Sequence, residues 1–215
     1  MARPVKTVDS PDYRAKIDQV AESLFAERGF DGTPIREIAE QTGVTKALIY
    51  HYYQSKEALY LSLLEKEAAT VVTRIEAVAA GEGDPEQKIR AIVQVFLDRY
   101  RIDPQSFRLV QRAIDDHSPA AHTLAERWFS RAHLAMEAIT AEGIDSGLFK
   151  PLPSGATPFV IVGIIIHALR ANQLMDRITP GFSGPEVLTQ LADLVLALLR
   201  TDRSPVSKGK KKHEE

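Results

Sequence analysis

The sequence of 215 residues contains no cysteine. Disulfide bonds, thiolate metal sites and cysteine nucleophiles are therefore excluded, and an intracellular compartment fits this composition. Long apolar segments are also lacking, because the longest one, from Phe159 to Ile166, falls far short of the ~20 residues that span a bilayer. The first residues, MARPVKTVDSPDY, contain no apolar region of the kind found in secretory signals. We therefore expect a cytoplasmic protein that neither spans a membrane nor is exported.

An excess of basic residues is lacking as well. The formal net charge is −2, and residues 1–65 contain eight Lys and Arg against ten Asp and Glu. Proteins that neutralise DNA phosphates normally have a basic surface. A DNA-binding surface on this chain must therefore be basic only locally.

What the chain does contain is a helical pattern. Hydrophobic residues make up 44% and charged residues 26% of the sequence, as in an ordinary globular protein. Apolar residues recur at intervals of three and four, and strand signals are nearly absent, which predicts an all-α fold. Caps, prolines and glycines predict about nine helices. They cover approximately residues 11–28, 34–42, 46–52, 55–78, 85–102, 104–115, 119–142, 157–176 and 185–200.

The segment Gly81–Asp84, with the sequence GEGD before Pro85, predicts the main internal boundary. We expect a DNA-binding domain at residues 10–73, with a helix-turn-helix at about 35–54. A larger helical domain for ligand binding and dimerisation follows at 84–200. Residues 201–215 are charged and predict a disordered tail.

Residues 35–53, IREIAEQTGVTKALIYHYY, predict the helix-turn-helix itself. Thr33 and Pro34 are expected to open its first helix, and Thr45 to cap its second. A small residue at Ala39 permits a close helix crossing, and Gly43 permits the tight turn. Inward packing is predicted for Val44, Leu48, Ile49 and Tyr52. At ~100° per residue, the outward side chains are then Lys46, Ala47, Tyr50, His51 and Gln54, and this surface suits a DNA major groove.

Local charge supports this interpretation. Lys46 is the only formally charged residue from Gln41 to Ser55, and Lys56 follows directly. Lys56 stands in the first turn of the next helix, where a cation opposes the helix dipole and a DNA phosphate would compensate for it. Backbone amides there and at Thr33 are natural phosphate donors.

The stretch AESLFAERGFDGTPIREIAEQTGVTKALIYHYYQSKEALYLSLL resembles the signature of the TetR family of transcriptional regulators, over roughly the first third of the chain. The family pattern is met at Gly43, Val44, Thr45, Ile49, Tyr50, Tyr52, Ser55, Lys56, Glu57 and Leu59. Ala47 stands where the family often has Gly or Pro, and Tyr53 where it usually has Phe. The resemblance implies phosphate contacts from Thr33, Tyr52 or Tyr53, and Lys56. It also implies that Thr45, Lys46, Ala47, Tyr50 and His51 lie in or beside the major groove.

The rest of the chain contains no catalytic pattern, and we expect no enzymatic activity, cofactor or metal. Asp115, Asp116, His117 and His122 do not have a ligand spacing, so we interpret them as a polar turn.

The helices near 157–176 and 185–200 are apolar over wide faces, so each requires burial on two sides. The resemblance implies that these last two long helices form a four-helix bundle with those of a second copy, giving a homodimer. It also implies a small-molecule effector among the middle helices that moves the fourth helix. Candidate effector contacts, although side chains of this kind at helical spacing ordinarily fill a core, are Phe96, Tyr100, Phe107, Gln111, Trp128, Met136 and His167.

The predicted function is a ligand-responsive regulator, most simply a repressor, that binds a palindromic DNA operator as a dimer. The rival interpretation is a helical ligand-binding or protein-interaction module that makes no use of DNA, and the net charge of −2 favours it. The two chain ends are either solvated or in contact with phosphates. The residues concerned are Arg3, Lys6, Lys208, Lys210, Lys211 and Lys212.

Overall fold

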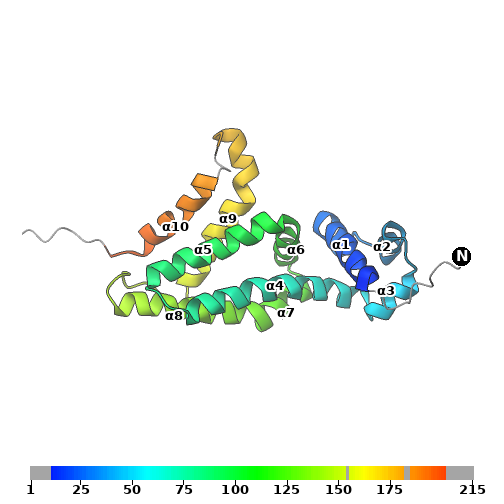
Figure 1. Ribbon diagram of the computed structural model, residues 1–215, viewed down its shortest axis with the longest axis horizontal. Coiled ribbons are helices and arrows are strands. Elements are labelled where there is room, and N and C mark those ends of the chain that lie inside the picture. Colours follow the sequence, from blue (N-terminus) through cyan, green and yellow to red (C-terminus); the bar gives the residue numbers. More distant parts are fainter. Residues whose placement is uncertain (1–10, 154, 182–184, 202–215) are drawn as a thin grey trace, which may run out of the picture. The chain divides into compact units, whose positions relative to one another are not determined.

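The computed structural model describes residues 11–153, 155–181 and 185–201 (Figure 1). Within these ranges it contains ten α-helices, one π-helical segment (η1) and no strand, which confirms the all-α prediction. The elements are α1 (Pro11–Arg28), α2 (Ile35–Thr42), α3 (Lys46–Tyr52), α4 (Lys56–Ala80), α5 (Pro85–Ile102), α6 (Pro104–Asp115), α7 (Pro119–Leu124), η1 (Ala125–Phe129), α8 (Ser130–Asp145), α9 (Thr157–Ile178) and α10 (Pro185–Leu199).

The predicted helix boundaries agree closely with these elements, apart from one region. The single helix expected at 119–142 is divided into α7, η1 and α8. A π turn inserts one residue into a helix without breaking it, so the apolar periodicity gives no sign of it. None of the helices among the described residues is long and apolar enough to cross a membrane.

Some predictions lie outside the described residues. They are the phosphate contacts considered for Arg3 and Lys6, and the tail from residue 202 onward with its lysines.

The chain divides into two compact units. Unit 1 comprises residues 1–81 and 94–135, and unit 2 comprises residues 82–93 and 136–215. Gly81–Asp84 does link α4 to α5, as expected, but residues 94–135 pack with the N-terminal helices. The functional division into 10–73 and 84–200 therefore stays a prediction.

The core of unit 1 combines the N-terminal helices with α4, α6 and α7. It includes Ile17, Leu24 and Phe25 of α1, together with Leu59 and Leu64 of α4. Leu109, Val110 and Ala113 of α6 and Leu124 of α7 join the same cluster. Because α1 shares this core with α6, the helix-turn-helix rests on helices from outside the N-terminal segment.

A buried polar network crosses the same unit. Arg99 of α5 donates to Glu67 of α4 at 2.6 Å and forms an ion pair with Asp103 at 2.9 Å. The Glu67 side chain is only 5% exposed, and burial raises the pKa of its carboxyl group against the opposing effect of Arg99. The Ser106 hydroxyl of α6 donates to Glu22 of α1 at 2.5 Å, which connects α6 to α1.

Unit 2 is built around the last two helices. Ile161, Ile165 and Leu169 are buried on α9 at the spacing of one helical face. The buried face of α10 contains Leu191, Ala192, Val195, Leu196 and Leu199. The ion pair of Arg200 with Glu86 at 2.5 Å lies near the surface of this unit.

Candidate DNA-binding surface

The turn between α2 and α3 is built as the sequence predicts. Gly43 follows α2 in the left-handed conformation, with φ of 70°. The N–H of Val44 donates to the carbonyl oxygen of Ala39 at 3.1 Å, which satisfies one of the last carbonyls of α2. Ala39 is buried beside Ile38, so its small side chain lies in the core. The turn therefore fixes the direction in which α3 leaves α2.

Helix α3 is short and is fixed by its cap and one buried residue. The Thr45 hydroxyl accepts from the N–H of Leu48 at 3.2 Å, which confirms the predicted cap. Ile49 is fully buried, while Leu48 and Tyr52 are half-buried. The five side chains that were predicted to face outward are all exposed: Lys46, Ala47, Tyr50, His51 and Gln54.

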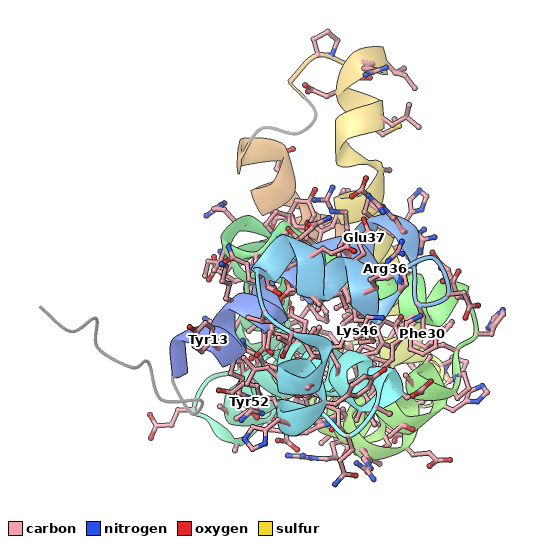
Figure 2. All side chains as sticks on the ribbon, turned by 90° about the vertical axis from the view of Figure 1, so that its right-hand side faces the viewer. Tyr13, Phe30, Arg36, Glu37, Lys46 and Tyr52 are labelled. Carbon is pink, nitrogen blue, oxygen red and sulfur yellow. The ribbon has the colours of Figure 1, made fainter. Side chains whose placement is uncertain are left out.

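The surface formed by α2 and α3 is locally basic, because its acidic groups are paired. Glu37 of α2 forms an ion pair with Arg28 at 2.5 Å, and Glu40 pairs with Arg36 at 3.4 Å. Lys46 has no ion-pair partner among the described residues and stands at this surface (Figure 2). Its charge is therefore not neutralised within the described part of the chain.

A hollow of about 470 Å³ adjoins the exposed face of α3. Its lining includes Tyr13 of α1, Val44 in the turn, and Ala47 and His51 of α3. The Ala47 side chain therefore lines a hollow at the exposed face of α3.

Thr33 is placed differently from the prediction. It is fully buried, and its hydroxyl donates to the carbonyl oxygens of Gly29 at 2.9 Å and Leu24 at 3.1 Å. The cap position of α2 is Pro34, which makes no side-chain hydrogen bond, so the cap expected from Thr33 was wrong. Thr33 instead satisfies carbonyls at the end of α1, and its N–H donates to the carbonyl oxygen of Phe30 at 3.3 Å, so both donors are used within the protein.

Tyr53 is also in the interior. It is 4% exposed, and its hydroxyl donates to the carboxylate of Asp18 on α1 while accepting from Arg14 Nε at 3.3 Å. Burial, followed by the hydrogen bond to Asp18, raises the pKa of its phenol group. Tyr53 therefore anchors the end of α3 to α1, whereas the side chain of Tyr52 is half-buried.

Helix α4 begins at the same surface. The Ser55 hydroxyl oxygen accepts from the N–H of Ala58 at 3.1 Å, which confirms this cap. Lys56 is half-buried, with its Nζ atom 4.2 Å from the centroid of the Phe30 ring. The carboxylate of Glu57 accepts from the Ser55 hydroxyl and from its own N–H, and the former contact is the larger cause of its lowered pKa. The first turn of α4 thus presents a lysine held on an aromatic face.

Three residues that position side chains of this surface were not predicted from the sequence: Arg14, Asp18 and Phe30. Arg14 and Tyr53 are 39 residues apart, and helical periodicity carries no information about contacts at this separation. The sequence could have indicated Arg14 as a cation on the exposed face of α1. No signal near Arg14 in the sequence identifies Tyr53 as its partner.

The structure brings together few of the candidate effector contacts. Tyr100 and Phe107 form an edge-to-face pair with centroids 5.3 Å apart in unit 1. Phe96, Phe107 and Met136 are buried, Tyr100, Gln111 and Trp128 are half-buried, and His167 is exposed. The indole Nε1 of Trp128 is buried without a hydrogen-bond partner. These residues belong to two units, so their common pocket stays a prediction.

Asp115 ends α6, Asp116 and His117 form the turn that follows, where His117 adopts a φ of 48°, and His122 lies on α7. No group of three or more His, Asp or Glu residues in the described part of the chain is arranged to hold a metal ion.

Comparisons with known proteins agree with this geometry. Residues 17–63 match the family model described as "Bacterial regulatory proteins, tetR family". The HTH-type transcriptional activator FasR of Mycolicibacterium smegmatis is 31% identical over 99 residues, which are 46% of this chain and 45% of FasR. The chain thus spans slightly less than half the length of that relative.

Longer matches exist as well. The HTH-type transcriptional repressor AcnR of Corynebacterium efficiens is 35% identical over 200 residues, covering 91% of this chain and 97% of AcnR. A crystal structure of a bacterial regulatory protein in the tetR family from Rhodococcus RHA1 has the same fold, with a TM-score of 0.75 and 19% identity over 90% of this chain and 100% of that one. The helix-turn-helix match and the relative matched over nearly its whole length confirm the resemblance: the chain belongs to the TetR family of bacterial regulatory proteins.

Proposed function

We propose that the protein is a sequence-specific DNA-binding transcriptional repressor, which binds a palindromic operator as a homodimer and is released by a small-molecule effector. The observation that carries the proposal is the exposed face of α3, where Lys46, Ala47, Tyr50 and His51 project from a helix anchored by the Thr45 cap and the buried Ile49. Such a face offers a cation, hydrogen-bonding rings and a small apolar group to the edges of bases.

Phosphate contacts complete the proposed interface. Lys56 at the start of α4 and the half-buried Tyr52 are the proposed phosphate ligands. We add Arg14, which is exposed on α1 and adjoins Tyr53. Thr33 and Tyr53 are assigned a structural role instead. A small basic surface doubled by two-fold symmetry accommodates the overall charge of −2.

The proposed homodimer uses α9 and α10. Phe159 is 78% and Ile178 68% exposed on α9, and Leu194 is 61% and Leu198 53% exposed on α10. These apolar groups lie on helices whose opposite faces are already in the core of unit 2, so a second copy supplies the missing burial. The two recognition helices of the dimer, separated by one turn of the DNA double helix, then bind the two halves of a palindromic site.

Repression is favoured over activation by the extent of the matches. The relative named as a repressor, AcnR, is matched over 97% of its length, whereas the relative named as an activator, FasR, is matched over 45%. The proposed effector is apolar or aromatic and binds among the middle helices near Tyr100, Phe107 and Trp128. The 25-residue α4, which begins directly after the recognition helix, transmits its binding.

The test is the double substitution Lys46→Ala with Tyr50→Ala, assayed by fluorescence anisotropy on an operator selected from random DNA. We expect about a 100-fold loss of affinity, because each base contact contributes roughly 1–3 kcal/mol. Arg101→Ala is the control, since it removes the same charge from an exposed position on α5. Unchanged affinity of the double variant would favour a helical module that makes no use of DNA.

A further inference from the structure

Lys56 is held by an aromatic ring rather than by a carboxylate. Its Nζ atom lies 4.2 Å from the centroid of Phe30, well inside the ~6 Å at which a cation is attracted to a ring face. No carboxylate among the described residues forms an ion pair with it. The charge of Lys56 is therefore positioned without being neutralised.

The position of Lys56 makes this contact important. Lys56 is the first residue of α4, where the helix dipole disfavours a cation. The face of an aromatic ring offsets part of that cost electrostatically. An ammonium group on a ring also keeps N–H donors for further acceptors, because it has three of them.

Phe30 is itself fixed from two sides. Its ring stacks on Phe25 of α1, with centroids 6.1 Å apart and planes inclined by 17°. It also lies 5.1 Å from the ring of Tyr60, a buried residue one helical turn after Lys56 on α4. Residues at i and i+4 share one helix face, so Phe30 covers the face of α4 that carries both Lys56 and Tyr60.

We propose that Phe30 is a positioning residue for DNA binding, which holds the ammonium group of Lys56 in place at the start of α4 for a backbone phosphate. A lysine that is already ordered loses less side-chain entropy when it binds, so the interaction is stronger than one made by a freely moving lysine. This role rests on the proposed function, because it requires that the Lys56 ammonium group contacts a DNA phosphate.

The test combines ring and charge substitutions: Phe30→Leu removes the ring, Phe30→Tyr keeps one, and Lys56→Met removes the charge. Binding to the selected operator is measured by anisotropy over a range of salt concentrations. We expect Phe30→Leu to weaken binding about tenfold and Phe30→Tyr to bind as the unaltered protein does. In Phe30→Leu, the slope of log K against log salt should fall in magnitude by ~0.9 for each phosphate that is no longer neutralised, and thus by about 2 in the dimer.

The double variant Phe30→Leu with Lys56→Met distinguishes a positioning role of the Phe30 ring from a role in packing alone. In the Lys56→Met background, Phe30→Leu should weaken binding little further, because the group that the ring positions is already absent. An equal effect of Phe30→Leu in both backgrounds, with an unchanged salt slope, would show that Phe30 acts only by packing and would overturn the proposal. Unchanged affinity of Phe30→Leu would overturn it too.

A measurement without DNA keeps the test independent of the stability of Phe30→Leu. The ring current of Phe30 should shift the ε-methylene resonances of Lys56 upfield in the NMR spectrum of the unaltered protein and of Phe30→Tyr. Random-coil values for these resonances would overturn the proposal. An unaltered protein that selects no DNA sequence would contradict the proposed function and this role with it, whereas operator binding with normal behaviour of Phe30→Leu contradicts the role of Phe30 alone.

Discussion

The two units expose surfaces of opposite chemistry. In unit 1, α2 and α3 present a polar surface on which the acidic groups are paired and Lys46 is not. In unit 2, α9 and α10 present exposed apolar side chains such as Phe159 and Leu194. A polar surface with unpaired positive charge suits a polyanion, and an apolar surface suits another apolar surface. This difference supports the proposal that unit 1 binds DNA and that unit 2 binds a second copy of the chain.

The units also differ in how their charges are held. Unit 1 contains the buried network of Arg99, Glu67 and Asp103, whereas the pair of Arg200 with Glu86 in unit 2 is exposed to solvent. Buried charges depend on their partners, and exposed ones depend mainly on water. Substitutions in the two units should therefore produce effects of different kind and size.

The largest expected effect follows from placing charge on the apolar surface of unit 2. The double substitution Leu194→Glu with Leu198→Glu should convert the dimer to a monomer, because two carboxylates per copy cannot be buried unpaired. Operator affinity should fall about 1,000-fold, since the second half-site no longer binds intramolecularly. Sedimentation velocity measures the change of oligomeric state, and anisotropy measures the change of affinity.

Leu134→Glu provides the matched control, because Leu134 is 63% exposed but lies on α8 in unit 1. It should stay dimeric. A dimer that persists in the variant Leu194→Glu with Leu198→Glu would show that the apolar surface of α10 is not the dimer interface.

A smaller effect is expected from the charge networks. Arg99→Met leaves the Glu67 carboxylate buried without its partner, and should lower the free energy of unfolding by about 3 kcal/mol. Arg200→Met removes an exposed partner of Glu86 and should change stability little. Urea denaturation of both variants measures the difference, and equal destabilisation would contradict the contrast between buried and exposed pairs.

The smallest effect concerns two glycines of unit 1 with similar backbone conformations. Gly29 has a φ of 77° and Gly43 a φ of 70°, but a Cβ atom at Gly29 would lie 2.9 Å from Arg112 Nε, whereas nothing lies within 4 Å at Gly43. Arg112 donates to the carbonyl oxygen of Glu27, so it cannot move away without breaking that hydrogen bond.

Gly43→Ala should therefore cost about 1 kcal/mol of unfolding free energy, from backbone strain alone. Gly29→Ala should cost about 2 kcal/mol, because a steric conflict is added. Thermal or urea unfolding distinguishes the two, and a larger destabilisation from Gly43→Ala would mean that the packing of α6 on the end of α1 is looser than described.

Much of the fold follows from local signals in the sequence. The helix boundaries depend on caps and glycines such as Thr45, Ser55 and Gly43, whose hydrogen bonds and dihedral angles involve near neighbours. The exposed face of α3 follows from helical geometry once Ile49 is taken as buried. These features were predictable because each is decided within a few residues.

The remaining features depend on contacts that the sequence does not encode locally. Thr33 fits a cap by type and position, but its hydroxyl turns back to the end of α1. The contacts of Tyr53 with Asp18 and of Lys56 with Phe30 join residues that are far apart in the sequence. The effector pocket is the least predictable, because aromatic residues at helical spacing fill a core and line a pocket equally well.

Selection of bound sequences from a pool of random duplex DNA tests the central claim most directly. We predict enrichment of one palindromic sequence, with half-sites about 10 base pairs apart from centre to centre or a multiple of that spacing, and loss of enrichment with Lys46→Ala and Tyr50→Ala. Binding without sequence enrichment, or enrichment that the double variant retains, would contradict it.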